Sequence, residues 1–372
     1  MTTRSGELLA SNEKLVNDLG AIRFTDMEKP DFRTFQNDLF YSHRSFDVFY
    51  AKLQRGEKSA IVSGLNPSGK LHLGHKVVFD TCLYFQEKYG MPVYIPLSDD
   101  ESYVSGKVEK RSEALVNAIK LIKGLIAYGF DPKNTKVILD FNYPEIFNIA
   151  IDLSKKLTLS KVKGVYGYSD STNIGLNFYP AIQAAHVLLP EIKYNIKNTL
   201  VPIGPDEDAH LMIGRDIADS MGYVKPAVIH AKFMPDTNFD KMSKSRPDGV
   251  IYLTDDEKSV KKKIQGAFSG GRATLEEHRR LGGEPESDVA MVYLTSYFLR
   301  KEEGDKIKLA YKAGELLSGE VKKMLLDQLI PFMQEFNKRL AQVDESAFTG
   351  ILMHKETDAV DARLIELFRK SQ

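Results

Sequence analysis

The sequence is poor in cysteine, carries no excess charge of either sign and contains no long apolar run. Its single cysteine, Cys82, excludes an internal disulfide and any zinc or iron–sulfur site built on several cysteines, and an apolar setting predicts a buried thiol. Because 51 basic residues balance 51 acidic ones, the chain is no basic coat for DNA, and any RNA contact needs local patches. No apolar run approaches the roughly 20 residues of a membrane span, and the first residues lack a signal-peptide core. These absences predict a cytoplasmic protein that does not associate with membranes.

The hydrophobic pattern divides the 372 residues at about residue 255. From residue 59, β-prone runs alternate with helical periodicity, and strands are expected at 60–62, 92–97, 137–141 and 200–203. This alternation predicts an α/β fold with a doubly wound parallel sheet over residues 57–254. The periodicity of residues 255–372 is almost wholly helical, which predicts a C-terminal all-α domain. Residues 1–56 are expected to form an N-terminal extension that is mainly helical.

A turn rich in glycine and histidine, Ser63–His75, follows the first strand of the α/β region and leads into a helix. Gly64 and Gly74 suit tight bends and the close approach of a bound group. His72 and His75 are three positions apart, so both imidazoles should face one side of a helical turn whose free N–H groups favour an anion. The turn indicates a phosphate site, but such turns are common in α/β domains, and a chance surface pair or half of a metal site is an alternative.

A second loop, far downstream, offers a different kind of phosphate ligand. It reads Lys241-Met242-Ser243-Lys244-Ser245 and presents two ammonium groups and two hydroxyls. These groups suit a polyphosphate, and a solvated surface loop is the alternative.

Polar residues also gather at the expected carboxyl ends of two strands, the edge at which open α/β sheets bind ligands. Ser98–Glu101 follows one strand and Gly204–His210 follows another. Three adjacent carboxylates at 206–208 repel one another and need partners, which a bound amine or ribose hydroxyl would supply. Metal binding and a solvated acidic turn remain alternatives.

A largely apolar helix is expected over 179–189, with Pro180 in its first turn. Beyond Tyr179 its only polar side chains are Gln183 and His186, which share a face because they are three residues apart. They indicate a pocket, and the alternative is a pair of satisfied core residues.

The Ser63–His75 turn and the Lys241–Ser245 loop together resemble the two nucleotide-binding signatures of class I aminoacyl-tRNA synthetases. From about residue 59 onward, further stretches are similar to the archaeal and eukaryotic branch of the tryptophanyl-tRNA synthetases: Ser98–Glu101, Phe178–Ala185, Ala267–Arg272, Glu276–Arg279, Gly282–Gly283 and Tyr311–Glu320. The later stretches are informative because tyrosyl enzymes share the catalytic loops but do not usually carry them. The resemblance implies a Rossmann-type catalytic domain, a helical anticodon-binding domain, a homodimer, and ATP with Mg²⁺.

The resemblance also implies roles for single residues. His72 and His75 would donate to the phosphates of ATP, and Lys241 and Lys244 would close over the leaving pyrophosphate. The implied ATP-binding set is Gly64, His72, Gly74, His75, Gly204, Asp206 at the ribose, Met242, Ser243, Lys244 and Ser245. The implied amino-acid-binding set is Glu101, Gln183, His186 and Glu207. No protein ligand for a metal ion is expected.

Three departures from the family pattern concern the amino-acid pocket. Glu207 stands where the family commonly has glutamine, and His186 stands where bacterial tryptophanyl and many tyrosyl enzymes have aspartate. Val62 and Pro96 match the positions at which eukaryotic tryptophanyl enzymes use Tyr and Gln to bind the indole N–H. The acceptor for that N–H therefore stays open among His186 as the neutral tautomer, Gln183 and Glu207.

The resemblance predicts a ligase that activates L-tryptophan with ATP, releases pyrophosphate and transfers the amino acid to tRNA(Trp). Such chemistry needs position and charge but no side-chain nucleophile. A tyrosine–tRNA ligase of the same subclass is one alternative. A synthetase-like paralogue that binds nucleotide or RNA without catalysis is another, although both signature loops are intact. A nucleotidyltransferase with the same histidine turn would leave the second domain unexplained.

Overall fold

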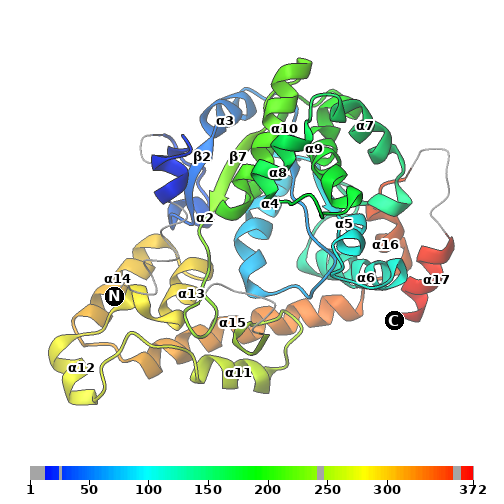
Figure 1. Ribbon diagram of the computed structural model, residues 1–372. Coiled ribbons are helices and arrows are strands. Elements are labelled where there is room, and N and C mark those ends of the chain that lie inside the picture. The colour runs from blue at the N-terminus through cyan, green and yellow to red at the C-terminus, as the bar shows by residue number, and fades with distance from the viewer. Residues whose placement is uncertain (1–12, 25–26, 241–246, 355–361, 372) are drawn as a thin grey trace. The chain divides into compact units, whose positions relative to one another are not determined.

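The computed structural model describes residues 13–24, 27–240, 247–354 and 362–371 (Figure 1). The Lys241–Ser245 loop lies outside these residues, and so does every side chain assigned from it to ATP or pyrophosphate. The chain forms two compact units. The first is drawn from Met1–Ser42, Leu71–Thr81 and Ala231–Lys338, and the second from His43–Lys70, Cys82–His230 and Arg339–Gln372. The three domain segments expected from the sequence stay predictions.

The strands of the described residues form one mixed sheet. They are β1 (Ile22–Arg23), β2 (Phe40–Arg44), β3 (Ser59–Val62), β4 (Val93–Leu97), β5 (Thr135–Leu139), β6 (Asn198–Ile203) and β7 (Ala227–Ala231), in the order β1-β2-β7-β6-β3-β4-β5. From β7 to β5 all neighbouring strands are parallel, with Ile61 beside Val93 and beside Leu200. The chain runs outward from β3 to β5 and then returns to β6 on the other side of β3. This reversal confirms the predicted doubly wound fold and creates a ligand crevice at the carboxyl ends of β3 and β6.

Both faces of the parallel strands are buried, which explains their continuous apolar runs. The helices of the second unit are α3 (Phe46–Gln54), α5 (Asp99–Val104), α6 (Arg111–Tyr128), α7 (Glu145–Ser154), α8 (Leu159–Tyr166), α9 (Ile174–Tyr194), α10 (Asp208–Met221), α16 (Glu345–Ile351) and α17 (Ala362–Lys370), and α4 (Lys76–Tyr89) enters it from the first unit. Ala60 and Val62 belong to one apolar cluster with residues of α7, α9 and α10. Ile61, between them, is fully buried outside that cluster, as the alternation of a strand requires.

Helix α9 begins earlier than the sequence pattern suggested. The side chain of Asn173 accepts the N–H of Leu176 and caps the helix, so Pro180 lies inside it and not in its first turn. The sequence pattern began the helix at Tyr179, five residues after its observed start at Ile174. A single side-chain cap therefore outweighed weak periodicity, and α9 gains a turn and a half at its start.

The first unit is helical except at its N-terminal strands. Its helices are α2 (Arg33–Gln36), α11 (Glu257–Gln265), α12 (Leu275–Leu281), α13 (Val289–Tyr297), α14 (Lys301–Lys312) and α15 (Ser318–Ala341), of which α15 is the long orange helix in Figure 1. Asp256, Thr274 and Asp288 cap three of them through their side chains. In the described chain from 247 onward, every element with defined bounds is helical, as predicted. Strands β1 and β2 were not expected in the N-terminal extension.

No helix of the described residues is long and apolar enough to cross a membrane.

Candidate functional site

A cavity of about 340 Å³ opens in the second unit at the carboxyl edge of the parallel strands. Gly64 and Asn66 follow β3, Ser98 and Glu101 follow β4, and Glu207 follows β6. Helix α9 supplies Tyr179, Gln183, His186 and Val187, while Tyr166 and Tyr168 come from the end of α8 and the turn after it. The apolar part of the lining is Val62, Leu65, Pro96, Val187, Val201, Ile203 and Leu211. The cavity therefore lies in the crevice that the strand order creates, and its apolar lining with a few polar groups suits a small amphipathic ligand.

Glu101 carries negative charge at one side of this cavity. It accepts hydrogen bonds from the side-chain amide of Asn66 and from Lys107 Nζ, the latter at 2.8 Å and 2.9 Å to its two oxygens. Its own side chain is only 12% exposed, so its charge is poorly screened by water. A carboxylate in this position can bind a substrate ammonium group.

Gln183 and Glu207, two of the predicted amino-acid-binding residues, already have protein partners. The hydroxyl of Tyr166 donates to the side-chain oxygen of Gln183. Glu207 is 49% exposed and lies 3.2 Å from His210 Nδ1, and the His210 ring stacks on Tyr166 with ring centroids 4.1 Å apart. Tyr166 thus connects the two residues, and its side chain fixes one wall of the cavity.

His186 connects the cavity to a buried group of carboxyl side chains. Its Nε2 lies 2.6 Å from Asp140 Oδ1, and the two side chains are 3% and 0% exposed. Asp99, Asp100 and Asp140 each place one oxygen within 4.8 Å of the other two. Oδ1 of Asp99 accepts the N–H of Asp140 at 2.8 Å, and Oδ1 of Asp100 accepts the N–H of Glu101 at 2.7 Å. The cluster therefore holds the ends of β4 and β5 against α9.

Burial controls the ionisation of this cluster. It raises the pKa of Asp140 well above its usual range, and together with the neighbouring Asp140 carboxyl it raises the pKa of Asp100 to about 8. Burial and the charge of Asp100 raise the pKa of Asp99 to about 6. Burial also lowers the pKa of His186 to about 4, against the opposing effect of Asp100 and Asp99. At neutral pH the cluster keeps at least one carboxyl proton, and His186 is neutral.

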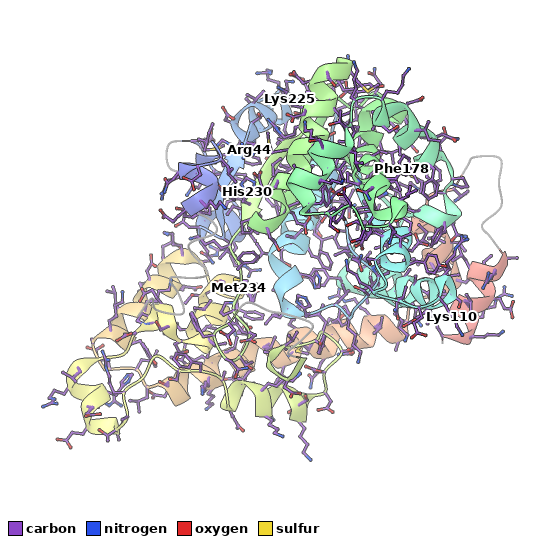
Figure 2. All side chains as sticks on the ribbon, viewed as in Figure 1. Arg44, Lys110, Phe178, Lys225, His230 and Met234 are labelled. Carbon is purple, nitrogen blue, oxygen red and sulfur yellow. The ribbon has the colours of Figure 1, made fainter. Side chains whose placement is uncertain are left out.

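The acidic turn after β6 separates into three different environments. Asp208 is buried and accepts Nε and Nη2 of Arg44, each at 2.7 Å, and its Oδ1 lies 2.9 Å from His230 Nε2. Burial alone would raise the pKa of Asp208, but the hydrogen bonds from Arg44 and His230 outweigh it and hold the pKa well below its usual range. Figure 2 labels Arg44 and His230, which sequence reasoning missed as partners for this turn. Asp206 is exposed, and Glu207 reaches the cavity.

The histidine turn belongs to the first unit. It forms the 3₁₀ turn η1 (Leu73–His75) before α4, and the ring centroids of His72 and His75 lie 3.9 Å apart, so the imidazoles do face one side. Nδ1 of His72 accepts the N–H of Gly74 at 3.2 Å, so the proton of this neutral ring is on Nε2. Nδ1 of His75 lies 3.1 Å from both the N–H and the carbonyl oxygen of His72. Tyr252 pairs with His72 and fixes the turn from the chain that follows the Lys241–Ser245 loop.

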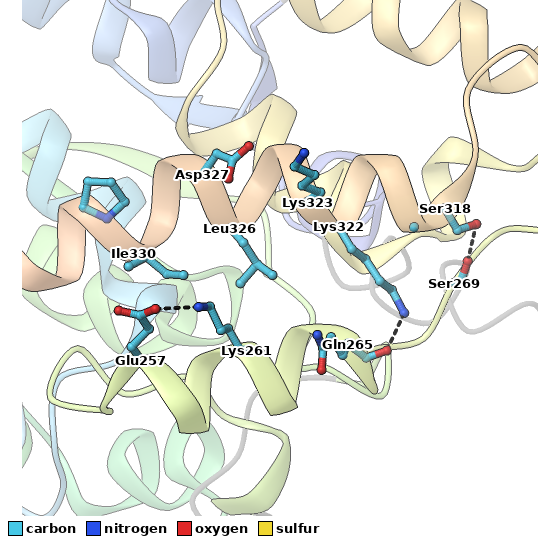
Figure 3. Close-up of a pocket in the computed structure, with 12 residues that line it drawn as sticks. Glu257, Lys261, Gln265, Ser269, Ser318, Lys322, Lys323, Leu326, Asp327 and Ile330 are labelled. Carbon is cyan, nitrogen blue, oxygen red and sulfur yellow. Dashed lines mark hydrogen bonds and ion pairs between the residues drawn. The ribbon is translucent and has the colours of Figure 1, made fainter.

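A second hollow, of about 850 Å³, lies in the first unit between α11 and α15 (Figure 3). Its basic side chains are largely engaged by the protein. Lys261 bonds Glu257 at 2.5 Å, and Lys322 donates to the carbonyl oxygens of Gln265 and Ala267 at 2.8 Å each. Ser269 and Ser318 bond each other at 2.7 Å.

The structure thus brings Gly64, Glu101, Gln183, His186 and Glu207 together in one cavity. Gly204 and Asp206 lie on the adjoining turn, while His72, Gly74 and His75 form the turn of the first unit. Cys82 is fully buried, and burial raises the pKa of its thiol to about 12. Asp140 was missed because the sequence pattern placed it inside a strand expected over 137–141, whereas β5 ends at Leu139. Tyr166 lay in a stretch with no distinguishing pattern.

Comparison with known proteins gives consistent matches over most of the chain. A family model described as "tRNA synthetases class I (W and Y)" matches residues 54–334. The chain is 37% identical over 338 residues to the tryptophan–tRNA ligase of Pyrobaculum aerophilum, covering 88% of this chain and 90% of that protein. It is 36% identical over 327 residues to that of Methanocaldococcus jannaschii, covering 86% and 88%.

Solved structures share the fold. The tryptophanyl-tRNA synthetase of Aeropyrum pernix K1 superposes with a TM-score of 0.84 at 29% identity, covering 96% of this chain and 100% of that one. That of Encephalitozoon cuniculi bound to tryptophan superposes with a TM-score of 0.83 at 27% identity, covering 92% and 97%.

Proposed function

The chain belongs to the class I tRNA synthetases of the tryptophan and tyrosine group, and from this premise we propose that it is a tryptophan–tRNA ligase. It activates L-tryptophan with ATP, releases pyrophosphate and transfers the tryptophanyl group to tRNA(Trp). The observation that carries the proposal is the similarity to tryptophan–tRNA ligases over nearly nine-tenths of the chain. The cavity supports it, because apolar walls with a carboxylate at one side suit an aromatic amino acid.

The reaction needs no nucleophile from the protein. The carboxylate of tryptophan attacks the α-phosphate of ATP, and the ribose hydroxyl at the end of the tRNA then attacks the mixed anhydride. Glu101 binds the ammonium group of the substrate, which holds the carboxylate of the amino acid in a fixed direction. ATP enters as its Mg²⁺ complex, which is a substrate of the reaction.

The residues assigned to ATP act by position and charge. Nε2–H of His72 is a donor suited to a phosphate oxygen, and His75 adds a second imidazole beside it. Gly64 and Gly74 leave room for the nucleotide, and exposed Asp206 binds the ribose. Lys241 and Lys244, with Met242, Ser243 and Ser245, close over the leaving pyrophosphate.

ATP–pyrophosphate exchange measured with each of the twenty amino acids tests this function. We expect exchange with tryptophan at least about tenfold above that with any other amino acid. Preference for tyrosine would replace the assignment with a tyrosine–tRNA ligase, and no exchange with any amino acid would favour a nucleotide- or RNA-binding paralogue.

The helical residues 255–372 bind the anticodon, and the enzyme acts as a homodimer in the cytoplasm. Sedimentation equilibrium at micromolar concentration should give twice the mass of the chain. Aminoacylation of tRNA(Trp), compared with tRNA(Tyr), checks the nucleic-acid partner.

A further inference from the structure

His186 presents one ring nitrogen to the protein and the other to the cavity. Nε2 lies 2.6 Å from Asp140 Oδ1. Nδ1 makes no hydrogen bond with any residue of the described chain, and it is not among the buried unpaired atoms there, so it is accessible from the cavity that His186 lines. Whether this nitrogen donates or accepts depends on which of the two carries the proton.

The surroundings of Asp140 decide that question. Its Oδ2 is buried and receives no donor from the described residues, while its carboxyl group neighbours that of Asp100. Two carboxyl groups this close in a buried site do not both ionise, so the pair holds one proton. Oδ2 of Asp140 is the oxygen with room for that proton, because it has no other partner among the described residues. Oδ1 of Asp140 is then left as an acceptor.

Nε2–H of His186 donates to that acceptor, which leaves Nδ1 without a proton. Burial keeps the ring neutral at physiological pH, since it lowers the pKa of His186 to about 4. The wall of the cavity therefore contains an imidazole nitrogen that can accept a hydrogen bond and cannot donate one.

The other candidate acceptors are less suited to this task. The side-chain oxygen of Gln183 already accepts the Tyr166 hydroxyl. Glu207 is 49% exposed and is paired with His210. Ser98 and Tyr179 are hydroxyls 3.0 Å apart that satisfy each other and can donate as well as accept.

We propose that Asp140 is a positioning residue that fixes His186 as the Nε2–H tautomer, and that Nδ1 of His186 accepts the indole N–H of the substrate. This inference rests on the proposed function and names the group that recognises the side chain. An indole satisfies Nδ1 because its N–H only donates. An analogue without that N–H leaves Nδ1 buried and unpaired, which lowers kcat/KM about 10- to 100-fold.

The test compares L-tryptophan with β-(3-benzothienyl)-L-alanine, in which sulfur replaces the N–H. The ratio of their kcat/KM values in ATP–pyrophosphate exchange is measured for the wild type, His186→Leu, Asp140→Ala and Asp140→Asn. The ratio is internal to each variant, so loss of correctly folded protein cancels. We expect a ratio of about 10 to 100 for the wild type and close to 1 for His186→Leu and Asp140→Ala. In these two variants the ratio falls because KM for tryptophan rises.

Asp140→Asn is the conservative control. Its amide oxygen can accept Nε2–H while its amide N–H donates to Asp100, which imitates a protonated aspartic acid. We expect this variant to keep the ratio within about twofold of the wild type. ¹⁵N NMR of labelled histidine should show the Nε2–H tautomer at His186 in the wild type and in Asp140→Asn.

An unchanged ratio in His186→Leu would overturn the proposal, and so would an Nδ1–H tautomer in the wild type. A cation at the carboxylates would give two results together. Asp140→Asn would lose the preference for tryptophan over the analogue, and EDTA would abolish the same preference of the wild type in an amino-acid binding assay. These results would overturn the shared proton. If the wild type does not activate tryptophan at all, it is the proposed function that fails.

Discussion

The two hollows of this protein differ in what their polar groups still need. The groove between α11 and α15 is the larger, at about 850 Å³, yet two of the three lysines that line it, Lys261 and Lys322, are bonded to a carboxylate or to carbonyl oxygens of the protein. The cavity at the sheet edge has about 340 Å³ and contains a shielded carboxylate and an imidazole nitrogen with no protein donor. Volume therefore does not identify the substrate site. The imidazole nitrogen of His186, which has no donor among the described residues, is a better indicator of it.

The first and largest expected effect concerns stability, and it compares a buried ion pair beside the cavity-lining Glu207 with an exposed ion pair at the groove. Asp208→Ala leaves Arg44 and His230 buried without their carboxylate, and we expect it to lower the free energy of unfolding by about 3–5 kcal/mol. Glu257→Ala at the groove removes an exposed ion pair and should leave the free energy of unfolding nearly unchanged. Urea unfolding of both variants measures the difference, and equal losses would remove this contrast.

The stabilising effect of Asp208 also depends on pH. Its pKa is lower in the folded state than in the unfolded chain, so its contribution is complete above the unfolded value of about 4 and declines as the pH falls further. The difference between the wild type and Asp208→Ala should be constant from pH 7 to 5 and narrow below about pH 4. Urea titrations at a series of pH values measure this difference in the free energy of unfolding. A difference that grows as the pH falls would contradict an ionised Asp208 in the folded state.

The second effect tests which hollow binds the amino acid. Glu101→Gln removes the charge expected to meet the substrate ammonium group, and we expect kcat/KM for tryptophan to fall about 10- to 100-fold. Asp327→Asn is the matched loss of charge in the groove and should leave kcat/KM within about twofold. A larger effect of Asp327→Asn than of Glu101→Gln would reverse the assignment of the two hollows.

The third effect compares two features of the first unit, the histidine turn and the groove. His75→Ala should slow adenylate formation at least about tenfold, because one phosphate donor is lost, and Lys244→Ala should do the same. Lys261→Ala should leave the rate of activation nearly unchanged. Single-turnover kinetics with tryptophan and ATP separate these cases, and normal rates in both of the first two variants would exclude the predicted roles.

The smallest effect belongs to the groove itself. Lys322 binds two carbonyl oxygens at the end of α11, so Lys322→Met should lower the free energy of unfolding by about 1 kcal/mol without changing KM for tryptophan. Figure 3 shows the bond to Gln265. Thermal unfolding measures the change in stability, and ATP–pyrophosphate exchange with the same preparation measures KM for tryptophan. A raised KM would assign the groove to the substrate.

The general layout could be predicted because it follows from periodicity and strand order. Gln183 and His186 share one face of α9, and Glu101 follows β4, as the sequence pattern indicated. The same rule about carboxyl ends of strands points to Asp140 only once the end of β5 is known to be Leu139, two residues before the end expected from the sequence. What could not be predicted is pairing between distant residues: nothing local connects Arg44 to Asp208, or Tyr166 to Gln183. The early start of α9 depended on one capping side chain, which periodicity does not register.

The two compact units have a consequence for how such a protein can be divided or recombined. Within the first unit, the backbone N–H groups of Leu73 and Leu253 donate to carbonyl oxygens of distant segments, and the side-chain amide of Asn37 donates to the carbonyl oxygens of Thr295 and Leu299. A gene fragment beginning at codon 255 would encode helices without the partners that complete them. Because the unit is built from three separate segments of the chain, its exchange between homologous genes requires five crossovers, at 42/43, 70/71, 81/82, 230/231 and 338/339. Packing therefore limits recombination of this protein as well as catalysis does.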